Sequence, residues 1–214
     1  MLNTPDLKGR QMDHHHHNNH EITFPSDVTR RALIKGIGLG IGASLLGSLS
    51  ISESYAATST LPGFDVFSKS VKTLKSGKYY LVESNGIPTH NMMIGITNWQ
   101  QQVPISQPYT DANSWSIPLQ PEYATIPLST KTNLMKGAVA IAVNGIPIFN
   151  ALNNRGEDSY LIGELDNWGG HCGKGDDYHY HAAPMHLSTI NGLKPIAFAL
   201  DGFAVYGAKE PDGT

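Results

Sequence analysis

The chain has almost no cysteine, because Cys172 is the only one among its 214 residues. A single cysteine cannot form an intramolecular disulfide, so a disulfide-stapled scaffold is excluded. Basic residues are also few: 15 lysines and arginines stand against 18 acidic residues and leave a net charge of −3. Nucleic-acid partners require a basic surface, so this balance predicts no such partner.

Several motifs that carry common chemistry are missing from the sequence. There is no G-x-S-x-G segment, so nothing supports the usual serine hydrolase elbow. There is also no phosphate-binding glycine loop and no dinucleotide fingerprint, and we expect no nucleotide cofactor. Carboxylates such as Glu164 and Asp166 are available for glycosidase chemistry, but their spacing alone does not pair them across a glycosidic bond.

The apolar stretch near the N-terminus is too short to cross a membrane. Residues 36–51 carry no charge, but they number only 16 and five of them are glycine, whereas a spanning helix needs ~20 residues. The stretch follows Arg30, Arg31 and Lys35 and precedes a small-x-small triplet that ends at Ala56. A basic region, a moderate apolar region and a small-residue cleavage site together form an export signal.

The arginine pair gives this signal the form of a twin-arginine leader. We predict that residues 1–56 are a long n-region and signal peptide that is cleaved, which leaves one domain at residues 57–214. The protein is then periplasmic or extracellular, and it meets the membrane only through the transient signal peptide. The alternative is an uncleaved membrane anchor, which the short, glycine-rich stretch disfavours.

Long helical periodicity is scarce, and short apolar runs are separated by glycine, proline and Asn-Gly or Asp-Gly pairs. Such a pair interrupts strand-like residues in three segments, 78–90, 138–150 and 195–207. We predict a β-hairpin in each, because these pairs favour type I′ turns. Their near-equal spacing suits an internal repeat, although hairpins resemble one another through turn chemistry alone. We expect a mainly β single domain, a hairpin-rich sandwich or barrel-like fold with long Pro/Gly-rich loops.

Residues 98–130 contain five prolines, two tryptophans and no lysine or arginine. Prolines at this density exclude a helix and favour edge strands and extended loops. Trp99 and Trp115 either stack on a sugar ring or anchor a long loop to the core, and residue preferences favour the anchor.

Histidine, which can bind metals and transfer protons, is abundant in this sequence, with ten in the chain. Five lie between residues 14 and 20, inside the predicted presegment, for which Met12 is an alternative start, and we assign them no function. Four of the other five fall within residues 169–186, which read GGHCGKGDDYHYHAAPMH. This segment is the candidate functional site.

Tyrosine and histidine alternate strictly over residues 178–181. On a β-strand, His179 and His181 would share one face at ~6.5–7 Å, close enough to converge on one ion. His171 precedes them on a glycine-rich loop that can bring it over the same face, and His186 can fold back from beyond. A strand with its tyrosines inward and two solvent-exposed histidines would show the same alternation, so this alternative stays open.

The residue types favour a transition metal. Imidazole-dominated ligation suits zinc or copper ahead of iron or nickel, whereas magnesium and calcium prefer oxygen ligands. Asp177 or its neighbour Asp176 can supply a carboxylate ligand or the acceptor that fixes an imidazole tautomer. Cys172 is more typical of a small buried thiol than of a ligand, and His90 is a weaker candidate. The predicted metal ligands are His171, His179, His181, His186 and Asp177.

The stretch DDYHYHAAP, preceded by GELDNWGGHCGKG and followed by FALDGFAVYG, resembles the YHYH-domain proteins. That family is exported and mostly bacterial, and the resemblance covers most of residues 57–214. It implies no settled activity, so no catalytic residue is assigned. Members commonly continue to a second Tyr-His-Tyr-His-like motif, whereas this sequence stops at residues 209–214. We therefore expect a short or truncated form, whose site is incomplete if the second motif supplies ligands.

Two functions follow from the sequence. The first is an exported YHYH-domain protein that binds a transition metal through its histidine cluster and meets an unidentified small molecule or glycan. The second is a non-catalytic surface or carbohydrate-binding β module in which the histidines are structural and Trp99, Trp115 and Trp168 make the contacts.

Overall fold

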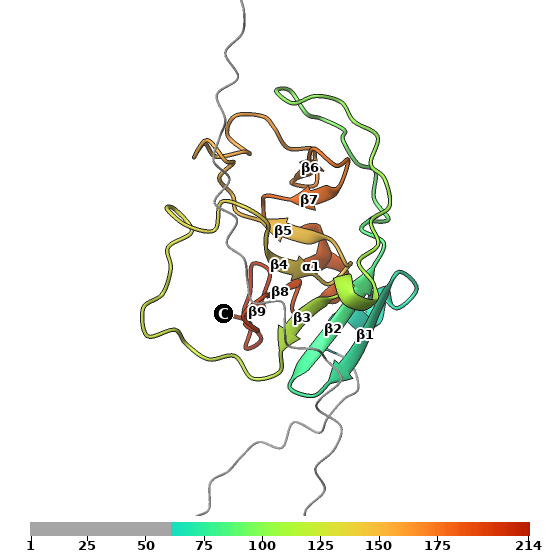
Figure 1. Ribbon diagram of the computed structural model, residues 1–214, viewed down its shortest axis with the longest axis vertical. Helices are drawn as coiled ribbons and strands as arrows, with labels where there is room; N and C mark the ends of the chain where they lie inside the picture. Colours follow the sequence, from blue (N-terminus) through green and yellow to red (C-terminus); the bar gives the residue numbers. More distant parts are fainter. Residues whose placement is uncertain (1–60) are drawn as a thin grey trace, which may run out of the picture. The chain divides into compact units, whose positions relative to one another are not determined.

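The computed structural model describes residues 61–214, all within one compact unit of the chain. The predicted export signal at residues 1–56 lies outside these residues. Within the described part, strands dominate, and the helical elements are short: η1 (Phe64–Phe67), η2 (Asp111–Asn113) and α1 (His186–Asn191). The strands form two sheets (Figure 1), and over residues 61–214 neither sheet closes into a barrel. The prediction of a mainly β single domain is therefore confirmed.

The smaller sheet is antiparallel and has the order β1-β2-β3, with β1 (Val71–Ser76), β2 (Tyr79–Ser84) and β3 (Trp115–Pro118). The chain reverses direction between β1 and β2 through a tight turn in which Gly77 has φ 58°. The hairpin predicted for residues 78–90 is therefore wrong. Because β1 and β3 occupy both edges of β2, the chain beyond the Asn-Gly pair finds no edge to pair with and runs on irregularly.

The larger sheet has six strands in the order β6-β7-β5-β4-β8-β9. Neighbouring strands are antiparallel except β5 and β7, which are parallel. The other two predicted hairpins are confirmed as β4–β5 and β8–β9, and they pair with each other through β4 and β8. The strands are β4 (Ala138–Ala142), β5 (Pro147–Phe149), β6 (Gly170–Cys172), β7 (Tyr178–Tyr180), β8 (Ala197–Ala199) and β9 (Ala204–Val205).

The hairpin turns differ from the predicted type I′. In the β4–β5 turn, Gly145 N–H donates to the Ala142 carbonyl and Ala142 N–H donates to the Ile146 carbonyl. Only the last residue of this three-residue loop, Gly145, has a positive φ, at 81°, which is the geometry of a type I turn followed by a left-handed residue. The same hydrogen-bond pattern joins β6 to β7 and β8 to β9. What recurs along the chain is thus this three-residue turn, and the segment around residues 85–86, predicted as part of an internal repeat, does not contain it.

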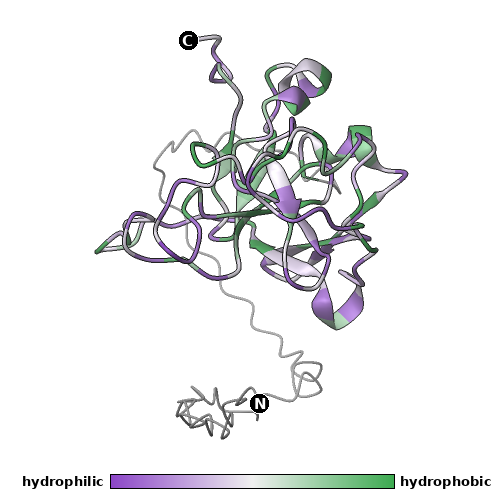
Figure 2. Cartoon of the chain, turned by 90° about the horizontal axis from the view of Figure 1, so that it is seen from above, coloured by the Kyte–Doolittle hydropathy of each residue, from purple (hydrophilic) through white to green (hydrophobic). Residues whose placement is uncertain are grey.

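The two sheets meet where β2 lies against the β4–β5 turn. Ser84 Oγ donates a hydrogen bond of 2.6 Å to the Gly145 carbonyl. A Cβ atom at Gly145 would lie 2.6 Å from Ser84 Cβ, so the approach of the two sheets requires glycine at this position. Apolar segments run through the middle of the domain, and many of the outlying loops are hydrophilic (Figure 2). Among the fully buried side chains are Phe64, Ile117, Ile141, Ile146, Tyr178, Tyr180 and Ile196.

The proline-rich residues 98–130 form no α-helix, as predicted. Their one strand, β3, is an edge strand that ends at Pro118, which fits the missing amide donor of proline. Trp99 and Trp115 are half-buried and pack against the core. This packing is the anchoring role that residue preferences favoured.

Candidate metal centre

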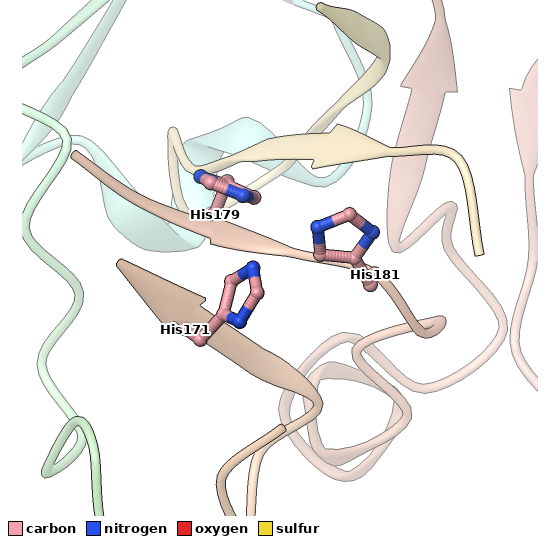
Figure 3. A group of neighbouring side chains, drawn as sticks. All are labelled: His171, His179 and His181. Carbon is pink, nitrogen blue, oxygen red and sulfur yellow. The ribbon is translucent and has the colours of Figure 1, made fainter. Parts of the chain in front are cut away.

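Three of the predicted histidines converge on one face of the β6–β7 pair (Figure 3). His171 on β6 lies directly opposite His179 on β7 in the antiparallel register. His181 follows β7 on the same face as His179, and the three ring centroids lie 4.8–5.1 Å apart. Each ring offers one nitrogen, and these three atoms all lie within 4.8 Å of one another. The predicted sharing of one face is thus confirmed.

His171 reaches this face from a strand and not from a loop, which corrects the prediction. Gly173 and Gly175 belong to the turn that reverses the chain between β6 and β7, where Gly173 N–H donates to the Asp177 carbonyl at 3.0 Å. The turn sets the antiparallel register, and this register places His171 beside His179. The glycines therefore act through strand pairing.

Backbone carbonyls fix the tautomer of all three rings. His171 Nδ1 lies 3.0 Å from the Glu164 carbonyl, His179 Nδ1 lies 3.0 Å from the Asp177 carbonyl, and His181 Nδ1 contacts the Asn150 carbonyl. A carbonyl oxygen only accepts, so each Nδ1 carries the proton and donates it. In the neutral rings each Nε2 then bears a free lone pair. The cluster presents three such lone pairs to a shared space.

Burial keeps the rings of His171 and His181 neutral. His171 and His179 are each 4% exposed and His181 is 9% exposed. Burial, reinforced by the nearness of His179, lowers the pKa of His171 to about 3 and the pKa of His181 to about 4. Neutral imidazole is the form that binds metals. The alternative of two solvent-exposed histidines is therefore wrong.

Two aromatic side chains hold the rings in place. The Trp99 indole stacks on His171 with centroids 4.7 Å apart, and its Nε1 donates to the Cys172 carbonyl at 3.1 Å. The Phe149 ring stacks on His179 at 4.0 Å and 17°. Phe149 has this position because its strand β5 lies next to β7. This role of Phe149 has no signal in the sequence, since the pairing of β5 with β7 joins distant parts of the chain.

Asp177 lies behind the His179 ring and not among the ligand atoms. Its Oδ2 is 3.5 Å from His179 Nδ1, the nitrogen that already faces the Asp177 carbonyl. The contact with His179 lowers the pKa of this carboxyl. Of its two predicted roles, the geometry places Asp177 in the one that orients an imidazole.

A cavity of about 280 Å³ opens onto the triad. The buried Glu164 carboxylate, 2% exposed, lines it and accepts from Arg155 Nη2 at 2.5 Å and from Asn153 Nδ2 at 3.3 Å. The exposed side chains of Lys136 and Lys174 lie on the same lining. The triad is therefore open on one side to a small molecule.

The other candidates lie elsewhere. His186 begins α1 and contacts His90, Trp168 and Tyr180, on the face of β7 opposite the triad. The prediction that His186 folds back onto the other histidines is corrected, because α1 packs against the tyrosine side of the sheet. His90 lies on that side as well. Cys172 is fully buried, and burial raises the pKa of its thiol to about 12, as for an inert core residue.

Glu164 and Asn150 contribute to the site in a way that was not predicted from the sequence. Both act on the triad through backbone carbonyls, which every residue type carries, so no side-chain pattern marks them. Asp166 is a further hidden contributor. Its buried carboxylate accepts from the Tyr178 hydroxyl at 2.8 Å and from the N–H groups of Met93, Trp168 and Gly170, so it positions β6 and β7.

These features define a mainly β domain whose paired strands hold a buried imidazole triad. Residues 114–214 match the family model described as YHYH protein, so this part of the chain is a YHYH domain. No curated protein and no solved structure matches the chain. Over residues 61–214, no helix has the length and apolar character needed to span a membrane.

Proposed function

We propose that this YHYH-domain protein binds one transition-metal ion through Nε2 of His171, His179 and His181. The observation that carries the proposal is the set of three carbonyl contacts at Nδ1, which leaves three converging lone pairs. Histidines that serve only as core residues need no such common orientation. Metal-bound histidines, in contrast, usually donate their other ring N–H to a carbonyl or carboxylate.

Zinc or copper fits this donor set best, because all three ligands are imidazoles. Ligand nitrogens around a tetrahedral zinc ion lie roughly 3.3 Å apart, given Zn–N distances of about 2.0–2.1 Å. The nitrogens here lie within 4.8 Å of one another, and small side-chain rotations close the difference. When bound, such an ion polarises water or another small ligand at a remaining coordination position.

The cavity over the triad supplies access to that remaining position. Three protein ligands plus an accessible position is the arrangement of catalytic zinc sites, whereas structural sites use four protein ligands. Among the described residues, the triad is the group of three or more histidine, cysteine, aspartate or glutamate side chains that lie close enough together to share an ion. The competing function, a carbohydrate-binding module with structural histidines, is less well supported because Trp99, Trp115 and Trp168 pack against the core.

Elemental analysis tests the proposal. The sample is the untagged full chain in which the five histidines between residues 14 and 20 are replaced by serine, since a histidine run binds metal by itself. We expect about one equivalent of zinc or copper to copurify, because a well-ordered three-histidine site binds tightly. The double variant His179→Ala/His181→Ala should lose this metal.

His186→Phe is the matched control, since it removes a histidine from the same region but from the opposite face of the sheet. It should keep the full metal content. Less than about a tenth of an equivalent in the parent protein, unchanged in the double variant, would contradict metal binding at the triad.

We also propose that the protein is exported through the twin-arginine route to the periplasm or beyond. The support comes from the sequence, where Arg30 and Arg31 precede a short apolar stretch and a small-residue cleavage site at Ala56. Export of a folded chain would let the metal be loaded before the protein leaves the cytoplasm.

A further inference from the structure

The loop at residues 150–164 follows β5 and supplies the acceptor for two of the three triad rings. Its first residue, Asn150, offers its carbonyl to His181 Nδ1. Its last residue, Glu164, offers its carbonyl to His171 Nδ1 at 3.0 Å. Whatever fixes the two ends of this loop therefore also fixes the orientation of these two imidazoles.

The two ends of the loop are held in different ways. The Asn150 side chain donates from Nδ2 to three backbone carbonyls outside the loop, those of Thr130, Asn133 and Leu134. These hydrogen bonds tie the first end of the loop to a separate part of the chain. The other end, Glu164, is held by residues of the loop itself.

Three of the polar atoms of Glu164 have partners within the loop. Its N–H donates to the Ser159 carbonyl at 3.0 Å. Its carboxylate accepts from Arg155 Nη2 at 2.5 Å and from Asn153 Nδ2 at 3.3 Å. The Glu164 side chain is 2% exposed, whereas the Arg155 side chain is 52% exposed. Arg155 thus reaches from the surface of the loop to a buried charge.

This ion pair is what permits the Glu164 carboxylate to be buried. A buried charge that loses its partner is strongly destabilised, whereas an exposed ion pair contributes little. Without the guanidinium, the carboxylate must turn toward water or take up a proton. Either change rearranges its hydrogen bonds within the loop. Because the carboxylate and the carbonyl belong to one residue, the acceptor of His171 moves as well.

We propose that Arg155 is a positioning residue of the triad. Through Glu164 it holds the carbonyl that keeps the proton of His171 on Nδ1 and leaves Nε2 free for an ion. The effect on metal affinity rests on the proposed function, whereas the effect on the ring does not. Disturbing the acceptor of a metal-bound histidine typically lowers metal affinity about 10- to 100-fold.

Arg155→Met tests the proposal, because methionine keeps an unbranched side chain and removes the guanidinium. The sample is the untagged chain in which the five N-terminal histidines are replaced by serine, and the probe is zinc in competition with a chromophoric chelator. We expect the zinc affinity to fall at least about tenfold. Arg155→Lys restores a positive charge beside Glu164 and should recover most of this loss.

Glu157→Gln is the matched control for this measurement. Glu157 is the other carboxylate partner of Arg155, 2.6 Å from its Nε, but its side chain is 48% exposed. Loss of an exposed ion pair costs little, so the zinc affinity should change less than about twofold.

A double-mutant cycle shows whether Arg155 acts through Glu164. Glu164→Met removes the carboxylate that the guanidinium contacts. Arg155→Met should then lower the zinc affinity less than about twofold in the Glu164→Met background, because the two residues act as one unit. Equal losses in both backgrounds, or parent-like zinc affinity in the single variant Arg155→Met, would overturn the proposal.

The tautomer of His171 provides a readout that needs no metal. NMR of the ring nitrogens in the metal-free chain at neutral pH should show Nδ1 protonated in the parent and a mixture of tautomers in Arg155→Met. The rings of His179 and His181 are internal controls, since their acceptors lie outside the Glu164 end of the loop, and their tautomers should not change.

This readout separates the present inference from the proposed function. A parent chain that binds no zinc would contradict metal binding at the triad, and the tautomer of His171 would still test the role of Arg155. A His171 ring that stays fully protonated at Nδ1 in Arg155→Met would contradict the positioning role, whether or not the parent binds zinc.

Discussion

At the scale of single residues, the position of one hydrogen-bond acceptor decides what each imidazole can do. The carbonyls of Glu164, Asp177 and Asn150 each take an Nδ1 proton and direct the opposite nitrogen toward the shared space. On the other face, the Asn91 carbonyl likewise accepts the Nδ1 proton of His90, but there Nε2 accepts a hydrogen bond from the Tyr180 hydroxyl. The same side-chain chemistry thus yields a ligand on one face and a link in a hydrogen-bond chain on the other.

The buried histidines predict that the fold loses stability in mild acid. In the unfolded chain these rings titrate near 6.5, whereas in the fold the pKa is about 3 for His171 and about 4 for His181. Below pH 6.5 the unfolded state therefore binds more protons, and stability falls as the pH decreases toward 4. We expect a loss of about 2 kcal/mol for each of these two rings between pH 7 and pH 5, in the presence of a chelator. Urea unfolding at the two pH values measures it.

His186→Phe is the control for this measurement, because it removes another ring whose pKa burial lowers to about 4. Its stability should fall less steeply with decreasing pH than that of the parent. A free energy of unfolding that does not change between pH 7 and pH 5 would contradict neutral, buried histidines.

At the scale of secondary-structure elements, the β6–β7 hairpin creates both faces of the site. The antiparallel register brings His171 beside His179 and sets Gly170 opposite Tyr180. Gly170 leaves room for the Tyr178 hydroxyl and the His179 carbonyl, because a Cβ atom there would lie 2.6 Å from each oxygen. Gly170 therefore leaves the space that the Tyr178 side chain occupies on one face, and the strand register brings His171 and His179 together on the other.

Gly170→Ala should destabilise the fold by about 1–3 kcal/mol, because the methyl group has no space between two oxygen atoms. The triad should also lose metal affinity, since β6 must shift to relieve the contact. Thermal unfolding and metal content measure the two effects.

Gly175→Ala is the matched substitution in the same hairpin, where the nearest atom to a Cβ would be Asp177 Oδ1 at 3.4 Å. It should change stability by less than about 0.5 kcal/mol. Equal effects of the two substitutions would show that the space above Gly170 is not what the strand pair requires.

At the scale of the whole molecule, long-range pairing joins the parts. The β4–β5 hairpin carries β8–β9 on one side and the histidine strands on the other, and its Gly145 turn meets the smaller sheet at Ser84. The site therefore depends on contacts between segments far apart in sequence, such as Phe149 against His179.

The fate of the whole molecule in the cell tests the proposed export. Arg30→Lys/Arg31→Lys keeps the positive charge but removes the arginine pair, so the chain should remain in the cytoplasm at its uncleaved length. Cell fractionation with immunoblotting measures this. The single variant Lys35→Arg leaves the pair intact and should be exported and shortened normally. Unchanged export of the double lysine variant would contradict the twin-arginine route.

The amino-acid sequence alone was enough to predict the fold class, the shared face of His179 and His181, and the presence of His171 beside them. Each of these follows from local chemistry: scarce helical periodicity, the two-residue period of a strand and a glycine-bearing turn close in sequence. It also marked the family, through the Tyr-His-Tyr-His segment and its neighbours.

The remaining features depend on how the whole chain folds. The hairpin predicted at residues 85–86 does not form, because β1 and β3 occupy both edges of β2. The same type of turn instead joins β6 to β7. His186 lies on the tyrosine face of β7, because the direction of α1 depends on what the helix packs against. The tertiary structure also orients the triad through the carbonyls of Glu164 and Asn150. Backbone groups are identical in every residue, so their positions come from the folded chain and not from the order of side chains.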